Sequence, residues 1–241
     1  MNAALSFASL SRAALLGAMT MLAASPAASA QRKYGTVSFE RVELVGNFNA
    51  SITVTTGAGV IADGDTDALE RLDVVVNNGT LTIREKRLSN ERGASTRASR
   101  PVVLTIRATG LKQVGLAGNG RVSVTGLREQ SAALFLRGNG EITASGINVS
   151  SASAMIDGAG RIVMSGRAQS LNAALTGAAS LDATALVTRD LDVTAQGTGR
   201  GSFNATRRAS VTATGLGVID VAGTAACNVK NTGNGEVYCG K

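Results

Sequence analysis

Few residues in this chain could carry out chemistry, and their types point away from catalysis. The sequence contains no histidine, which removes the commonest general base and the commonest metal ligand. No serine lies in a Gly-x-Ser-x-Gly nucleophile motif. Asp190 and Asp192 are the closest acidic pair after residue 110, and an exposed strand edge explains them better than the paired carboxylates of a polysaccharide hydrolase or lyase. We therefore expect no enzyme, no bound metal and no cofactor.

The two cysteines suggest a structural bond. Cys227 and Cys239 lie six residues before and six residues after Gly233. If the flanking segments form strands on the two sides of one turn, both side chains point inward and a disulfide is geometrically feasible. Such a bond fits an oxidising, exported setting. Two buried free thiols are the alternative.

Charged side chains recur three residues after the first glycine of turns that repeat along the chain. This position holds Arg121, Glu141, Arg161 and, two repeats later, Arg200. Stacking of the repeats would bring equivalent positions about 4.8 Å apart, so the signs would alternate along the stack. One interpretation is a surface charge stripe that recognises acidic ligands. The other, which we favour, is mutual pairing that stabilises the stack.

The elements that must position these residues are set by a repeat of 18–20 residues. Each repeat has a Gly-x-Gly-like turn between two alternating segments. A near-constant step of this length indicates a solenoid in which no repeat buries its apolar face alone. The seven turns are Gly118-Asn119-Gly120, Gly138-Asn139-Gly140, Gly158-Ala159-Gly160, Gly177-Ala178-Ala179, Gly197-Thr198-Gly199, Gly215-Leu216-Gly217 and Gly233-Asn234-Gly235.

Apolar residues flank each turn with a period of two, which is typical of half-buried strands rather than helices. Around the second turn, for example, Leu134 and Leu136 precede it and Ile142 follows it. A second glycine often recurs eight residues after the first, as at Gly146, and supplies the other corner of the coil. The sequence therefore predicts an all-β, right-handed parallel β-helix of about seven coils.

The chain before the repeats does not show the 18–20-residue pattern. Residues 1–30 are expected to be a cleaved signal peptide, because Arg12 precedes an apolar run and Ala28-Ser29-Ala30 resembles a cleavage site. Residues 31–110 are expected to form a β-rich segment that packs on and caps the solenoid, and residues 111–241 the coils. Within the segment we expect one short helical turn at Asp67–Leu72, a hairpin around Asn77-Asn78-Gly79, and a mobile polar loop at 88–100.

Charge and composition limit the partners. The formal net charge is +7, and loss of Arg12 with the signal peptide leaves +6. This balance favours acidic glycans, lipopolysaccharide phosphates or anionic surfaces, although a basic protein without such partners has the same balance. Nucleic acid is a poor fit, because aromatic residues make up only 3% of the chain and no binding motif is present. No apolar run after the signal peptide is long enough to span a membrane.

Several segments occur along the chain in a fixed order. They are Phe39–Leu44, Ile52-Thr53-Val54 followed by Gly57, Gly79–Ile83, Val103–Ile106, Gly110-Leu111 and the Gly-Asn-Gly coils. This ordered set resembles the head GIN domain family of auto-transporter adhesins. The resemblance implies a β-helical protein of the cell envelope with a role in adhesion, and it transfers no catalytic or binding residue.

We therefore expect a non-enzymatic, exported protein of the cell envelope, located in the periplasm, at the outer-membrane surface or outside the cell. Its leading function is an adhesin-like binding module for glycans or surface proteins. The alternative is a structural protein that associates with itself through the ends or faces of the β-helix. A polysaccharide-active enzyme is the third and weakest hypothesis, because fold analogy alone would support it.

Overall fold

The computed structural model describes residues 29–35, 37–86 and 101–240. The predicted mobile loop and nearly all of the predicted signal peptide lie outside these residues. The described chain is a tall stack of parallel coils, a β-solenoid of about six turns, with 72% of residues in strands. The prediction of an all-β solenoid is confirmed, and the expected seven coils are close to the observed number.

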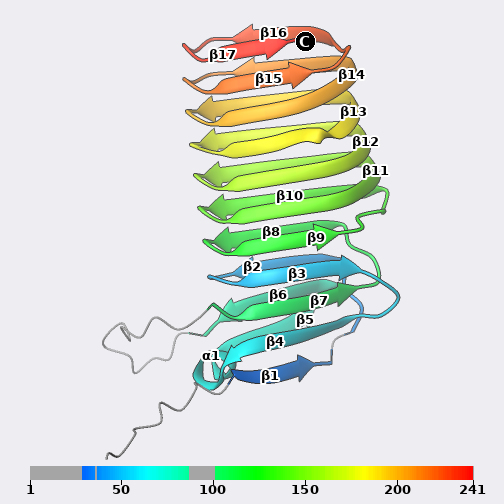
Figure 1. Cartoon of the computed structure of the whole chain (residues 1–241), viewed down its shortest axis with the longest axis vertical. Coiled ribbons are helices and arrows are strands. Elements are labelled where there is room, and N and C mark those ends of the chain that lie inside the picture. The colour runs from blue at the N-terminus through cyan, green and yellow to red at the C-terminus, as the bar shows by residue number, and fades with distance from the viewer. Residues whose placement is uncertain (1–28, 36, 87–100, 241) are drawn as a thin grey trace, which may run out of the picture.

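The upper part of the stack is regular. Each coil has two strands, one on each side of a flattened core, and each strand pairs in parallel with its counterpart in the next coil (Figure 1). The strands are β8 (Gln113–Gly118), β9 (Arg121–Thr125), β10 (Ser131–Gly138), β11 (Glu141–Gly158), β12 (Arg161–Gly177), β13 (Ser180–Gly197), β14 (Arg200–Ala213), β15 (Val218–Ala222), β16 (Ala226–Asn231) and β17 (Glu236–Cys239).

The two edges of the solenoid differ. At the edge that we call the glycine edge, the chain reverses through the Gly-x-Gly-like turns. At the opposite edge, β11, β12 and β13 pass through a corner without ending, and register shifts mark the bends. Gly146 lies at one such corner with a φ of 66°, a conformation that glycine adopts without strain.

In one coil at the base, the strands do not pair in the order in which they occur along the chain. β2 (Arg41–Val45) and β3 (Asn49–Val54) are joined by the turn Gly46-Asn47-Phe48 and pair in parallel with β8 and β9 above. The same two strands pair in parallel with β6 (Thr80–Glu85) and β7 (Val103–Ala108) below. This turn does not match the Gly-x-Gly pattern of the repeats, because Phe48 occupies the place of the second glycine.

Antiparallel elements cover the lower end of the stack. β1 (Ser29–Tyr34) pairs with β4 (Gly59–Asp65), and β4 pairs with β7. The expected helical turn is α1 (Thr66–Glu70). β5 (Leu72–Asn77) forms the expected hairpin with β6, and Asn78 and Gly79 have positive φ values of 48° and 72°, as a tight hairpin turn requires.

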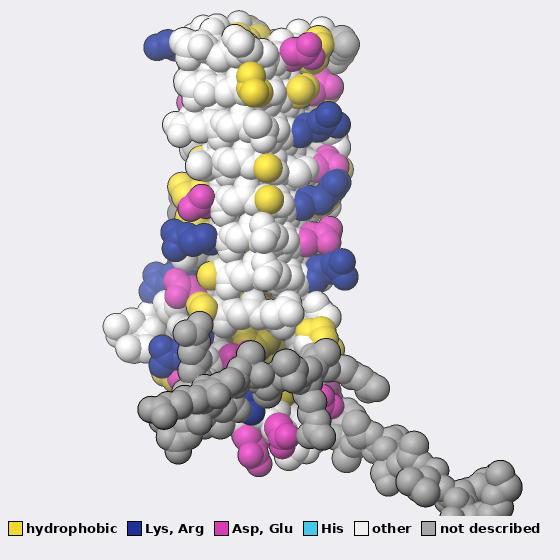
Figure 2. All heavy atoms as spheres, turned by 90° about the vertical axis from the view of Figure 1, so that its left-hand side faces the viewer, with side chains coloured by type: hydrophobic (Ala, Val, Ile, Leu, Met, Phe, Trp, Pro, Cys, Tyr) yellow, Lys and Arg dark blue, Asp and Glu magenta, His cyan; other side chains and the backbone are white. Residues whose placement is uncertain are grey.

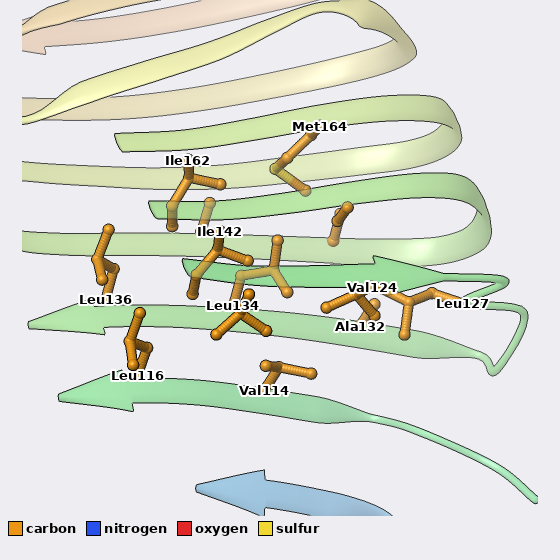
Figure 3. Packing of buried hydrophobic residues seen from close by; sticks show 14 of the residues in the cluster. Val114, Leu116, Val124, Leu127, Ala132, Leu134, Leu136, Ile142, Ile162 and Met164 are labelled. Carbon is orange, nitrogen blue, oxygen red and sulfur yellow. The ribbon is translucent and has the colours of Figure 1, made fainter. Parts of the chain in front are cut away.

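The core is a continuous column of apolar side chains from neighbouring coils. Leu116, Leu136 and Ile156 are in register on one sheet, and each is at most 2% exposed. Ile142 and Ile162 stack in the same way on the other sheet (Figure 3). The predicted inward parity is therefore correct for these coils. In the last coil, however, Val229 is 42% exposed, because no described strand lies above it.

Candidate functional site

The predicted charge stripe follows the glycine edge, and its members are in register. Arg121, Glu141, Arg161 and Arg200 occupy equivalent positions, with Ser180 between the last two. Arg121 Nε donates a hydrogen bond of 3.0 Å to Glu141 Oε2. Arg161 donates to Asp182 Oδ2 at 3.4 Å. The structure therefore brings Arg121 and Glu141 together, and it pairs Arg161 with a carboxylate that lies outside the predicted set.

Neutralisation is the main electrostatic property of this stripe. Figure 2 shows a pale column of turn residues with basic and acidic side chains alternating along one side of it. The side chains of Arg121 and Glu141 are 78% and 36% exposed, and exposed pairs of this kind contribute about 1 kcal/mol or less. From Arg121 to Arg161 the charges alternate, and both arginines are paired with carboxylates, which leaves little net attraction for an acidic ligand. The pairing interpretation therefore fits this part of the stripe better.

A shallow hollow lies beside the same edge, on the outer face of the sheet that contains β2, β8, β10 and β11. It has a volume of about 310 Å³ and an apolar floor that includes Val45, Phe135 and Met155. Glu43, Arg137 and Asp157 also line it. Because these charges have both signs, the hollow does not select for acidic ligands.

The opposite edge of the solenoid is more strongly basic. We call it the corner surface and define it by five arginines, two carboxylates and three amides at the corners of successive coils. All five arginines are exposed, and apart from Arg207 none forms an ion pair within the described part of the chain. The residues are Arg128, Glu129, Gln130, Asn148, Arg167, Gln169, Arg189, Asp190, Arg207 and Arg208.

The first coils of the corner surface enclose a polar hollow of about 380 Å³. Arg128 and Arg167 line it together with the carboxylate of Glu129 and the amides of Gln130, Asn148 and Gln169, so that arginines outnumber carboxylates two to one. A guanidinium can donate two parallel hydrogen bonds to a carboxylate, sulfate or phosphate. A side-chain amide can donate to and accept from hydroxyl groups. The hollow therefore offers the polar groups that an acidic sugar requires.

The pKa of Asp190 reflects the excess of positive charge on the upper part of the corner surface. Its carboxylate accepts hydrogen bonds from Arg207, one of them from Nε at 2.9 Å. This hydrogen bond lowers the pKa of Asp190 below its ordinary value, and the charges of Arg208 and Arg189 lower it further. Three arginines thus act on one carboxylate, and positive charge remains in excess.

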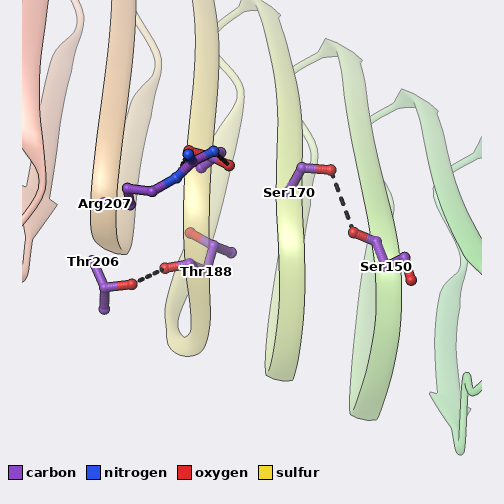
Figure 4. A network of polar contacts seen from close by, with 6 residues as sticks. Ser150, Ser170, Thr188, Thr206 and Arg207 are labelled. Atoms are coloured by element: carbon purple, nitrogen blue, oxygen red, sulfur yellow. Dashed lines mark hydrogen bonds and ion pairs between the residues drawn. The ribbon is translucent and has the colours of Figure 1, made fainter.

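Hydroxyl groups hold the corners of successive coils together. Thr206 Oγ1 donates to the carbonyl oxygen of Thr188 at 3.0 Å, and Ser170 Oγ donates to that of Ser150 at 3.4 Å. Figure 4 shows these residues on successive coils, with Arg207 close to Thr206. Because the backbone is held in this way, the arginines project from a rigid support.

The corner surface was not predicted from the sequence, although a signal for it exists. Arg128, Asn148 and Arg167 each lie ten residues before the first glycine of a turn, and Arg189 and Arg207 lie eight residues before one. These positions lie in the middle of the repeat, away from the glycine turns that define it.

The structure joins Cys227 to Cys239 in a disulfide with a Cα–Cα distance of 6.4 Å. The bond connects β16 to the end of β17 and closes the last coil. Cys239 packs against the edge of the core, whereas Cys227 is exposed. The bond therefore replaces part of the packing that a further coil would supply.

Reduction of this disulfide should loosen the last coil and leave the rest of the stack intact. The bond closes a short loop, so we expect a local loss of about 2–3 kcal/mol at most. Hydrogen exchange of the oxidised protein and of the Cys227→Ser/Cys239→Ser variant measures this loss. Faster exchange should be confined to residues 226–239, and an equal increase at β10 or β11 would contradict the prediction.

The fold and its surfaces define a class: a capped β-solenoid that carries a basic edge and has a disulfide in its last coil. A family model described as "putative auto-transporter adhesin, head GIN domain" matches residues 38–225. The chain therefore belongs to the head GIN domain family, and the resemblance inferred from its segments is confirmed. The family and the disulfide indicate an exported protein with an adhesin-like, non-enzymatic role.

Solved structures show the same fold at low sequence identity. A "putative adhesin" from Bacteroides fragilis is 18% identical, with a TM-score of 0.81 over 88% of this chain and 97% of that chain. A "putative adhesin" from Parabacteroides merdae is 16% identical, with a TM-score of 0.69 over 88% and 96%. A "putative lipid binding protein" from Parabacteroides distasonis is 18% identical, with a TM-score of 0.68 over 88% and 97%.

Three further findings limit the description. No curated protein matches the chain at a significant level. Within residues 29–35, 37–86 and 101–240, no helix has the length and apolar character needed to cross a membrane. In the same residues, no cluster of three or more histidine, cysteine, aspartate or glutamate side chains could hold a metal ion.

Proposed function

We propose that this protein is a non-enzymatic, adhesin-like module of the cell envelope that binds acidic glycans through its corner surface. The observation that carries the proposal is a set of four exposed arginines that form no ion pair in the described structure, of which Arg128 and Arg167 line a polar hollow with three side-chain amides. In the predicted charge stripe, by contrast, Arg121 and Arg161 are paired with Glu141 and Asp182, and Arg200 alone of its arginines forms no ion pair within the described residues.

The geometry of the stack supports a polymeric ligand. Neighbouring coils repeat at about 4.8 Å, so Arg128 and Arg167, which lie two coils apart, present their charges at a fixed separation. A glycan with regularly spaced carboxylate, sulfate or phosphate groups could engage several arginines at once, and the individually weak contacts would add through multivalency. Because the side chains project from a rigid support, binding would order few additional groups.

The location of such a ligand follows from the exported character of the family. Lipopolysaccharide phosphates and acidic surface polysaccharides are the acidic glycans available at the envelope, in the periplasm or outside the cell. Surface proteins with acidic segments would use the same charges and form the other outcome of a binding test. The name of the Parabacteroides merdae structure is consistent with an adhesin role, although at 16% identity it supports only the fold.

Two double variants separate a binding site from bulk charge. Arg128→Ala/Arg167→Ala and Arg121→Ala/Arg161→Ala each remove two exposed arginines, from the corner surface and the glycine edge respectively. On a sulfated polysaccharide matrix and on immobilised lipopolysaccharide, we expect the corner variant to elute at clearly lower salt than wild type. The glycine-edge variant should elute close to wild type. When retention is compared at fixed salt, the difference between each variant and wild type should shrink at higher salt, because charges are screened.

Equal loss of retention in the two variants would mean that only net charge matters, and the corner surface would then have no special role. A glycan array with the wild-type protein identifies the acid group. If no acidic glycan is retained but an acidic surface protein is, the glycan proposal is wrong.

A further inference from the structure

The two ends of the solenoid differ in what covers them. The lower end is covered by the antiparallel strands β1, β4 and β5 and by α1. In the part of the chain that the structure describes, no strand lies above the last coil, which consists of β16 and β17. Val229 of this coil is 42% exposed, whereas Val211, its register partner in the coil below, is 1% exposed.

Backbone groups of the last coil also face the open side. The N–H of Thr232 donates to Ala213 O at 2.9 Å, and that of Glu236 donates to Gly217 O at 3.0 Å. These bonds point into the coil below. Because successive residues of a strand direct their N–H and C=O groups to opposite sides, the groups of Val229 and Val237 point away from the stack. The open end is therefore an unpaired strand edge with apolar side chains between its two strands.

We propose that this end pairs with the same end of a second copy of the chain. The two-fold axis would run parallel to the strands, between β16 and β17. The disulfide shows that residues equally far before and after Gly233 face each other across the coil, since it joins Cys227 to Cys239. Rotation about this axis places β16 of one copy over β17 of the other, in antiparallel orientation.

This arrangement satisfies the exposed groups in a specific register. Val229 lies four residues before Gly233 and Val237 four residues after it, so Val229 faces the partner's Val237. The free N–H and C=O groups of both residues then point toward each other, as in a hydrogen-bonded antiparallel pair. The valines and the disulfide of each copy are covered by those of the other.

Charge complementarity supports the same register. Lys230 lies three residues before Gly233 and Glu236 three residues after it, and both are exposed. The two-fold axis places Lys230 opposite the partner's Glu236 in the non-hydrogen-bonded positions, where antiparallel side chains are closest. Symmetry produces this pair twice, once on each outer face. A second copy therefore completes both the hydrogen bonding and the charge pattern of this end.

The contact is small, because it consists of two short strand pairs. Interfaces below about 1,200 Å² are usually weak, so association should depend on concentration. Sedimentation velocity and light scattering on the purified, oxidised protein measure it. We expect the mass to rise from that of one chain toward that of two as concentration increases.

A charge exchange tests the register. Lys230→Glu and Glu236→Lys each place like charges opposite each other twice per dimer, and each should weaken association by roughly tenfold or more. The double variant Lys230→Glu/Glu236→Lys restores opposite charges and should associate nearly as well as wild type. Arg200→Glu, the same reversal on the glycine edge, is the matched control and should change nothing. Thermal melting verifies that all variants fold.

Three results would overturn the proposal: a single-chain mass at every concentration, a double variant as weak as the single variants, or masses well beyond two chains, which would indicate open-ended stacking. This association is independent of glycan binding. Lys230→Glu should retain the salt-dependent binding of the corner surface, so either proposal can fail while the other stands.

Discussion

Replacement of Ile142 by aspartate is expected to lower the free energy of unfolding by about 4 kcal/mol or more. Ile142 is fully buried, with Val122 in register below it and Ile162 above it. The coil offers no polar partner for a carboxylate between these side chains, so the variant would bury a charge or open the stack. Because each coil rests on its neighbours, the damage should spread to the adjacent coils.

The residue next to it provides the control. Thr143 is exposed, and its register neighbours are Ser123 and Val163. Thr143→Asp therefore introduces the same side chain on the solvent side, where we expect a change of at most about 0.5 kcal/mol. Denaturant unfolding of both variants measures the difference. Similar stability of the two would mean that the assignment of inner and outer faces is wrong.

Gly158→Ala is the second change with a large expected effect, about 3 kcal/mol of destabilisation. Gly158 has a φ of 130°, and a Cβ atom there would lie 2.5 Å from the carbonyl oxygen of Gly138. The obstacle is the backbone of the coil below, which cannot rotate away as a side chain can. The alanine variant would have to separate two stacked turns.

Gly115→Ala is the matched control for this prediction. A Cβ atom at Gly115 would approach no atom closer than 3.7 Å, and the backbone there does not have a positive φ. Alanine at this position should leave stability unchanged or raise it by up to about 1 kcal/mol. Thermal melting compares the two variants, and an equal loss would show that the close approach of the glycine turns is not what requires glycine.

Much of the solenoid could be predicted from the sequence because its coils are local and repeated. The turn at Gly138 and the strands beside it recur in the next coil, so each repeat supports the interpretation of the others. The hairpin at Asn78-Gly79 was readable for a similar reason, since its geometry depends on two adjacent residues. The coil that contains Gly46 could not be predicted from the sequence. Its partner strands lie far along the chain, and a turn that occurs once does not establish a repeat.

The candidate site was predictable only in part. The register of Arg121 and Glu141 follows directly from the repeat, and the structure places them within hydrogen-bond distance. The pairing of Arg161 with Asp182 depends on side-chain directions that spacing alone does not determine. The corner surface depends on bends whose lengths differ between coils, as the register shift between Ala183 and Val187 shows. A single spacing therefore does not find all of its arginines, because Arg128 and Arg167 lie ten residues before a turn and Arg189 and Arg207 lie eight.

The out-of-order coil at the base has a consequence for how the chain folds. Arg41 pairs with both Thr80 and Gln113, so β2 and β3 leave the ribosome well before either neighbour exists. Long segments must close before these strands gain their contacts, and closure of this kind is slow. Coils from β10 upward can each add to a finished neighbour. The base should therefore be the slowest part of the chain to form, whereas the upper coils depend on neighbours that are close in sequence.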